Sequence, residues 1–187
     1  HSLLPVDRSE GEWRNSVGTV AQPVDEQPIA FNHSIHAKPV DDGGLGMDCQ
    51  YCHSNARESR HAGVPATQVC MNCHKMIKEG PKYGETEIAK ITEAYESGKA
   101  IEWVRIHNLP DHAYFNHSQH VVVGGLECET CHGDVKNMEV VYQYSTLGMG
   151  WCINCHRQEK VKVGGSANNE GITVEDMGGL NCARCHY

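Results

Sequence analysis

The chain has 187 residues, of which 39% are hydrophobic and few are aromatic (Phe 2, Trp 3, Tyr 7), so it suffices for one domain or two small ones with a thin core of side chains. Its net charge of −8 argues against nucleic acid or an anionic membrane surface as a partner, and leaves a basic patch on another protein open. No run of 18 apolar residues and no basic-then-apolar amino-terminal signal appears. Because the chain starts at His1 rather than Met, we expect a processed or truncated product, which an export signal or a membrane anchor could have preceded.

The first predicted element is an extended arm, followed by a repeated string. Residues 1–30 contain three prolines, scattered charges and no steady hydrophobic period. The string FNHSIH then begins at Phe31, and the similar string FNHSQH begins 84 positions later, at Phe115. Such an internal repeat indicates a duplicated unit.

A helix is predicted between the two strings. Residues 84–98 place three apolar side chains on one helical face, carry glutamates early, and have Gly98 in position to end the helix. Short strands are predicted at residues 101–106 and 140–144, where β-branched and aromatic residues gather.

All ten cysteines fall into five copies of Cys-x-x-Cys-His. This motif attaches haem c through two thioether bonds, and its histidine supplies one ligand to the iron. We therefore predict five covalently attached haem c groups, whose buried apolar rings would add the core volume that the side chains lack. Haem c is attached after export, so we expect a location outside the cytoplasm. The motifs are Cys49/Cys52/His53, Cys70/Cys73/His74, Cys128/Cys131/His132, Cys152/Cys155/His156 and Cys182/Cys185/His186.

Each repeated string precedes two of these motifs, and the fifth motif stands alone. The predicted fold is accordingly mainly irregular and α-helical, with short helices and loops wrapped around five haems and little β structure. The predicted organisation is an arm (1–30), a first di-haem module (31–83), a helical connector with a short strand (84–114), a second di-haem module (115–160) and a carboxy-terminal single-haem segment (161–187).

Each haem iron needs a second axial ligand to be low spin and inert to substitution. The strongest candidates are the histidines that recur at identical spacing in the two strings, namely His33, His36, His117 and His120. For the fifth position the sequence leaves five alternatives open. They are His61, His107, His112, Met138 and Met149, and a methionine would raise the potential of its haem.

Other residues near the motifs are candidates for contacts with the haem. Phe31 and Phe115 are expected to pack on a porphyrin face or edge. A guanidinium matches a carboxylate bidentately, so nearby arginines could pair with propionates. They are Arg57, Arg60, Arg105 and Arg157.

Zinc is the alternative metal for Cys-x-x-Cys pairs, because cysteine and histidine suit a tetrahedral zinc site. Zinc knuckles would require the motifs to pair, would leave one motif over, and would not explain a histidine directly after every pair. The sequence therefore favours haem.

The paired F-x-H-x-x-H strings ahead of the motifs resemble the class III multihaem cytochromes. In that family the first histidine ligates the haem that follows in sequence and the second reaches a different haem. The resemblance implies that His33 ligates the Cys49/Cys52 haem and His117 the Cys128/Cys131 haem, whereas His36 and His120 serve other haems.

Residues 29–157 also resemble the pentahaem subunit of alternative complex III, a bacterial quinol-oxidising complex. The resemblance implies a subunit on the periplasmic face of the inner membrane, held there by its partners or by a lost amino-terminal anchor. It would pass electrons from a menaquinol-oxidising assembly with an iron–sulfur subunit to a monohaem cytochrome or an oxidase. The strings that carry it are HAGVP (61–65), VCMNCH (69–74), WVRIHNLPD (103–111) and MGWCINCH (149–156).

Two functions remain in competition. The first is an electron-relay subunit with no substrate of its own. The second is a multihaem reductase in which one iron keeps an open position for substrate. Seven histidines besides His1 lie outside the motifs, which is enough for five distal positions, so the relay is favoured.

Overall fold

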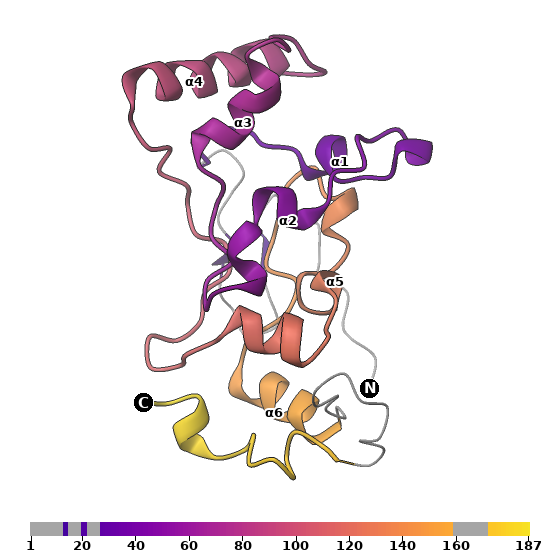
Figure 1. Cartoon of the computed structure of the whole chain (residues 1–187), viewed down its shortest axis with the longest axis vertical. Helices are drawn as coiled ribbons and strands as arrows, with labels where there is room; N and C mark the ends of the chain where they lie inside the picture. Colours follow the sequence, from indigo (N-terminus) through magenta and orange to yellow (C-terminus); the bar gives the residue numbers. More distant parts are fainter. Residues whose placement is uncertain (1–12, 15–19, 22–26, 159–171) are drawn as a thin grey trace.

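The computed structural model describes residues 13–14, 20–21, 27–158 and 172–187 (Figure 1). Most of the predicted arm, and the beginning of the predicted carboxy-terminal segment, lie outside these residues. The described helices are short apart from α4, as the predicted fold class requires. The elements are β1 (Trp13–Arg14), β2 (Val20–Ala21), α1 (His33–His36), η2 (Val40–Asp42), α2 (Cys49–Cys52), η3 (Ser54–Arg57), α3 (Thr67–His74), α4 (Gly84–Ser97), η4 (Gln119–Val123), α5 (Cys128–His132), η5 (Val135–Asn137), α6 (Met149–Gln158) and η7 (Cys182–Arg184).

The predicted helix between the two strings is confirmed as α4. Its side chains Ile88 and Ile91 are buried, and Gly98 caps its end in the left-handed region at φ 68°. A residue with a side chain would be strained there, so Gly98 stops the helix at low cost. Helix α4 packs against α3.

The two predicted strands are wrong. Residues 101–106 and 140–144 are not in β structure. In the first segment a side chain takes hydrogen bonds that a neighbouring strand would supply, because the Gln27 amide accepts from the Val104 N–H at 3.2 Å and donates to the Val104 carbonyl at 3.0 Å. In the second segment the Gln143 side chain accepts from the Asn108 N–H and donates to the Thr146 carbonyl, and so joins two loops. In the described part of the chain, the β-strands are β1 and β2, an antiparallel pair of two residues each.

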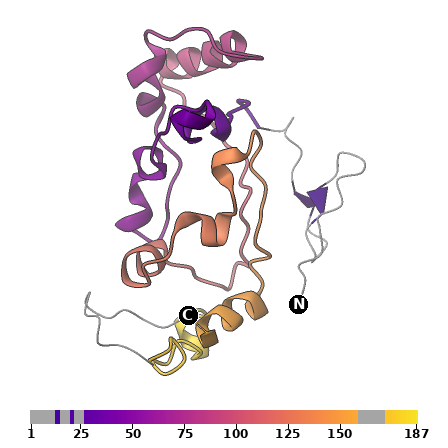
Figure 2. The same ribbon diagram turned by 90° about the vertical axis from the view of Figure 1, so that its right-hand side faces the viewer.

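The described elements are strung along one axis (Figures 1 and 2). Helices α3 and α4 form one end, α2 and α5 lie in the middle, and α6 with the carboxy-terminal residues forms the other end. After α4 the chain runs back along the molecule toward η4. No helix among the described residues is long and apolar enough to cross a membrane.

Apolar burial is confined to a few described side chains. Ile29, Met71 and Ile91 form a cluster against which Ile101 and Trp103 pack. No described side chain falls below 2% exposure. The thin core expected from composition is therefore present in the fold.

Candidate haem-binding site

The Cys-x-x-Cys-His motifs all lie on helical turns. Four belong to α2, α3, α5 and α6, and the fifth belongs to the 3₁₀ turn η7. Asp48 caps α2 by accepting the Gln50 N–H, and Asn181 caps η7 by accepting the Ala183 N–H. A spacing of three residues puts both thiols on the same side of a turn. None of the ten cysteines is in a disulfide, as thioether attachment requires.

The ten cysteines differ in exposure. Cys73 of α3 and Cys182 of η7 are exposed, whereas the other eight cysteines are half-buried. At α3 the apolar cluster around Met71 packs against Cys70 and does not include Cys73, which lies nearly one helical turn further on. A thioether bond needs only a thiol that reaches the haem, so Cys73 remains a predicted attachment residue.

Seven histidines share one orientation of the imidazole ring, with Nδ1 at a backbone carbonyl oxygen 2.7–3.0 Å away. Since a carbonyl only accepts, Nδ1 carries the proton and Nε2 keeps its lone pair. This arrangement is typical of metal-binding histidines, whose second nitrogen donates to a fixed acceptor. The seven are His36, His53, His74, His117, His120, His156 and His186.

Motif histidines are paired with histidines from elsewhere in the chain. Two imidazoles on opposite sides of one iron have ring centroids roughly 6 Å apart, because each metal–nitrogen bond is about 2 Å long. The observed centroid distances are 6.2 Å for His36–His74, 6.4 Å for His117–His132 and 6.1 Å for His120–His156. Each of these three pairs fits one iron.

The carboxy-terminal motif is paired with His112. The rings of His112 and His186 are stacked with centroids 5.4 Å apart, and the Nδ1–H of His186 donates to the His112 carbonyl at 2.8 Å. The neighbouring Tyr114 donates its N–H to the Cys185 carbonyl and stacks on Tyr187. These contacts hold the segment around His112 against the end of the chain.

His33 lies near His53, the histidine of the first motif. Burial, together with the nearby His53 and His36 rings, lowers the pKa of His33 to about 4, so this imidazole is neutral at pH 7 and able to bind a metal. The environments of the two repeated strings match closely: Phe31 meets His33 edge-on at 4.8 Å, and Phe115 meets His117 edge-on at 4.8 Å. Both phenylalanines therefore contact the predicted ligands themselves.

Burial also lowers the pKa of His36, His120 and His132, and in each case neighbouring histidines add to the shift. For His36 and His120 a hydrogen bond to a backbone carbonyl opposes it. These rings are thus held neutral, the form in which imidazole binds iron.

The alternative fifth ligands are placed differently. His61 is exposed, and in the described part of the chain no second imidazole stacks against its ring. Met149 is 65% exposed at the start of α6, and Met138 is buried with its carbonyl accepting the Ser34 N–H. His107 lies against His132, but on the Nδ1 side: its Nε2 is 3.1 Å from the His132 Nδ1.

Neighbouring thiols place the five motifs in a spatial order. Burial raises the pKa of Cys52, and the thiols of Cys70 and Cys49 raise it further. Burial and the Cys49 thiol, which hydrogen-bonds to it, raise the pKa of Cys128 to about 11. The α3 motif thus lies beside the α2 motif, which lies beside the α5 motif.

The remaining motifs extend the same line. Burial raises the pKa of Cys131, and Cys155 and Cys152 of α6 add to the shift. Burial likewise raises the pKa of Cys152, and Cys185 adds to the shift. The spatial order of the motifs is therefore α3, α2, α5, α6, η7, which agrees with their succession along the long axis in Figure 1.

One further side chain, that of Arg60, fits haem. In the described residues, the buried side-chain atoms without a hydrogen-bond partner are His33 Nδ1 and Arg60 Nε. The Arg60 guanidinium lies 5.2 Å from the Tyr114 ring centroid and 5.5 Å from that of Tyr187, beside the carboxy-terminal motif. A buried donor in this position suits a propionate. The donor set, thiols outside any disulfide with paired neutral imidazoles, fits covalently bound haem.

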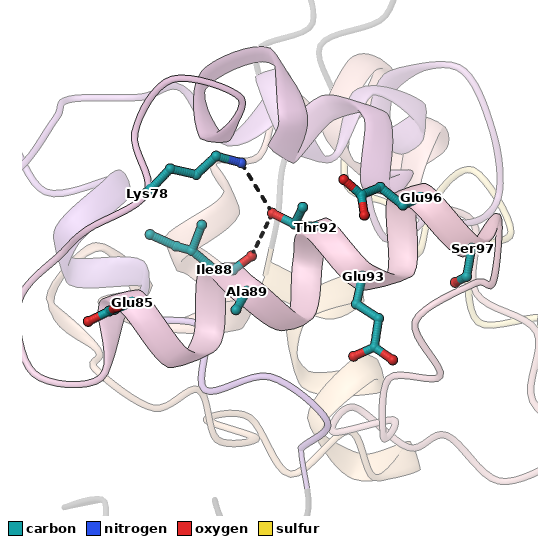
Figure 3. Close-up of a pocket in the computed structure, with 8 residues that line it drawn as sticks. All are labelled: Lys78, Glu85, Ile88, Ala89, Thr92, Glu93, Glu96 and Ser97. Carbon is teal, nitrogen blue, oxygen red and sulfur yellow. Dashed lines mark hydrogen bonds between the residues drawn. The ribbon is translucent and has the colours of Figure 1, made fainter.

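A shallow groove along α4 lies apart from these pairs (Figure 3). Lys78 reaches across it to the Thr92 hydroxyl, which donates to the Ile88 carbonyl. No histidine or cysteine lines the groove, so it offers no ligand to iron.

Comparison with known proteins agrees with this chemistry. A model of the class III cytochrome c family matches residues 14–107, and one of cytochrome c7 and related cytochromes c matches residues 113–187. The chain belongs to the class III/c7 group of multihaem cytochromes c. It is also 30% identical over 181 residues to the multihaem cytochrome c subunit of menaquinone reductase from Nitratidesulfovibrio vulgaris, an alignment that covers 86% of this chain and 77% of that one.

As a multihaem cytochrome c, the protein binds haem c and transfers electrons. Cytochromes of these families are generally extracytoplasmic. The sequence did not indicate that His112 contacts His186. His112 is not part of a repeated string, and its partner His186 lies 74 positions away, so no local spacing pointed to their contact.

Proposed function

We propose that this cytochrome is a five-haem electron-relay subunit of a membrane-bound, quinone-linked complex, in which all five irons have two histidine ligands. The observation that supports it is that four motif histidines each have a ring partner from elsewhere in the chain, and that His33 lies near the remaining one, His53. The proposed pairs are His53 with His33, His74 with His36, His132 with His117, His156 with His120, and His186 with His112.

The residues of each site have distinct tasks in this proposal. The cysteines would hold the porphyrin by thioether bonds, and the two histidines of each pair would both bind the iron, which would leave no position for substrate. Backbone carbonyls at Nδ1 fix the planes of the rings and raise their basicity. Arg60 would hold a propionate. When bound, haem c supplies an iron that changes oxidation state by one electron.

The order of the motifs suggests a path between two ends of the protein. One end is the α3 motif, next to α4, and the other is the η7 motif at the carboxy terminus. The two exposed cysteines, Cys73 and Cys182, belong to these two end motifs, so partner proteins are expected at both ends. The chain's net charge of −8, to which haem propionates add, favours a partner with a basic docking surface.

The membrane partner is proposed on similarity. The relative from Nitratidesulfovibrio vulgaris is described as a subunit of a menaquinone reductase, and residues 29–157 resemble the pentahaem subunit of alternative complex III. We therefore propose that the protein belongs to a complex at the periplasmic face of the inner membrane. Of the two we propose the alternative complex III type, in which electrons leave menaquinol through an iron–sulfur subunit and reach a monohaem cytochrome or an oxidase.

A quantified low-temperature EPR spectrum of the oxidised holoprotein tests the ligand assignment. Haem content should be five per chain, and the low-spin signals should account for all of it. A high-spin fraction approaching one haem in the native protein would contradict the relay and favour a reductase with an open iron.

Two matched variants sharpen this test at the carboxy-terminal motif. His112→Ala should convert one haem of five to high spin, because it removes the distal imidazole opposite His186. His61→Ala should leave all five low spin. The reverse result would assign the fifth ligand to His61.

The direction of transfer requires the purified complex. With menaquinol as donor, reduction of the five haems ahead of an added monohaem cytochrome is expected. If instead a soluble donor reduces the haems and these reduce menaquinone, with no turnover in the other direction, the complex is a quinone reductase and the alternative complex III assignment fails.

A further inference from the structure

His132 is an exception among the motif histidines. The other four are His53, His74, His156 and His186, and each directs its Nδ1 to a backbone carbonyl. The Nδ1 of His132 instead faces the Nε2 of His107 at 3.1 Å, with the rings at 81° and their centroids 4.5 Å apart. One motif histidine thus has a side chain as its second partner.

His107 is fixed in place from several directions. Its carbonyl accepts from the Arg105 Nε at 3.0 Å, and the next residue, Asn108, donates its N–H to Gln143 at 3.1 Å. The Gln143 side chain also donates to the Thr146 carbonyl. The ring of His107 is therefore held by its own loop and by the segment that leads into α6.

The distance of 3.1 Å between the two nitrogens fixes how the pair shares one hydrogen, because only one of the two nitrogens can donate to the other. A neutral imidazole has one donor and one acceptor nitrogen. Since the Nε2 of His132 is required for the iron, its Nδ1 carries the proton and donates to the Nε2 of His107.

The same geometry separates His107 from the ligands. His107 would have to use its Nε2 to bind an iron, but this nitrogen faces the Nδ1 of His132. His117, by contrast, lies parallel to His132 within 5° at a centroid distance of 6.4 Å, with its own Nδ1 at the Arg60 carbonyl. The two histidines thus lie at different sides of His132, and His117 would supply the second ligand to an iron held by His132.

We propose that His107 is a positioning residue for the haem of the α5 motif: by accepting the Nδ1–H of His132 it fixes the plane of that ring and lowers the reduction potential of this haem. An imidazole nitrogen is a stronger base than a carbonyl oxygen. It therefore gives His132 more anionic character, which stabilises the oxidised iron. The inference rests on the proposed function, in that it requires haem at Cys128 and Cys131.

The test uses the full holoprotein with His107→Leu and His107→Gln. Leucine removes the acceptor and keeps an apolar side chain in the buried position, whereas the glutamine oxygen can still accept from Nδ1. Redox titration followed by EPR should show five low-spin haems in both variants. In His107→Leu the potential of one haem should rise and its g-values should change, and His107→Gln should return both toward the native values.

Three results would overturn the proposal. A high-spin haem in both His107 variants would make His107 a ligand. Unchanged potentials in His107→Leu would remove its positioning role. If the potential of one haem rose equally in His61→Leu, which changes an exposed histidine, the rise in His107→Leu would not be specific to the contact with His132.

A fourth variant separates this proposal from the one on which it rests. His117→Ala should give one high-spin haem, because it removes the distal ligand opposite His132. If it leaves five low-spin haems, the ligand assignment fails, whereas the His107 variants still report whether the potential of one haem depends on the second partner of His132.

Discussion

The two ends of the molecule are stabilised in different ways. At the α3–α4 end, Ile29, Met71 and Ile91 form an apolar cluster, as in an ordinary small domain. At the other end, residues 149–158 and 172–187, as far as they are described, include no buried side chain. That end is held by hydrogen bonds to histidine, such as His156 Nδ1 to the Gly179 carbonyl at 2.9 Å.

The difference shows where the proposed haems matter for folding. An end without an apolar cluster needs another apolar body to bury its surface, and a covalently attached porphyrin is such a body. The α3–α4 end already has an apolar cluster that does not depend on a porphyrin. The predictions below test this contrast from the largest expected effect to the smallest.

Removing an attachment site should cost more at the α6 end than at the α3 end. Cys152→Ala/Cys155→Ala should lower the thermal midpoint by roughly 10 °C or more, since binding energy of the cofactor is folding energy where the protein core is thin. Cys70→Ala/Cys73→Ala should lower it by roughly half as much, because the cluster at Met71 remains and Cys73 is exposed. Haem content and thermal unfolding of both variants measure the contrast, and equal losses would refute it.

Removing a buried side chain at the α3–α4 end should lower the free energy of unfolding. Ile91→Ala should reduce the free energy of unfolding by roughly 2–4 kcal/mol, because Ile91 is 7% exposed and its loss leaves a cavity against Met71. Ile77→Ala, at a side chain that is 53% exposed, should change it by less than about 0.5 kcal/mol. Urea unfolding checks both, and similar losses would mean that the cluster is not a core.

The same contrast explains which parts of the structure were predictable. Helix α4 was predicted because its information is local: an apolar period, early glutamates and Gly98 all lie within the helix itself. The prediction of a strand at residues 101–106 failed because Gln27 supplies hydrogen bonds to Val104 from 77 positions away, and no feature of residues 101–106 encodes them.

The haem sites were also predictable only in part. The motifs and the repeated strings are local patterns, so their cysteines and histidines could be named as candidates from the sequence. Which imidazole faces which, and which thiol is left exposed, as Cys73 is, are properties of the fold. His107 and His112 both precede the second string, and both were candidates for the fifth ligand. In the structure His107 lies at the Nδ1 of His132, whereas His112 stacks on His186.

The smallest predicted effect concerns the link between residue 30 and α4. The Glu87 carboxylate accepts from the Ala30 N–H at 2.8 Å and from Lys90 at 2.7 Å, with 15% of its side chain exposed. Burial raises its pKa, but the hydrogen bonds from Lys90 and Ala30 outweigh burial, and the pKa lies below its ordinary value. The charged form is therefore favoured by folding.

Because the pKa of Glu87 is lowered in the folded state, the effect of Glu87→Gln on stability should depend on pH. At pH 7 the variant should be less stable by roughly 0.5–1 kcal/mol, because the Ala30 N–H loses a charged acceptor while the partly exposed Lys90 pair contributes little. The stabilisation by Glu87 is complete above the unfolded-state pKa of about 4.3 and is lost as the pH falls through the lower folded-state pKa. The difference in urea midpoint between the native chain and the variant should thus shrink below about pH 4.3. Glu93→Gln, on the exposed face of the same helix, should show no such difference at either pH, and a gap that stays constant on acidification would mean that Glu87 acts through packing and not through its charge.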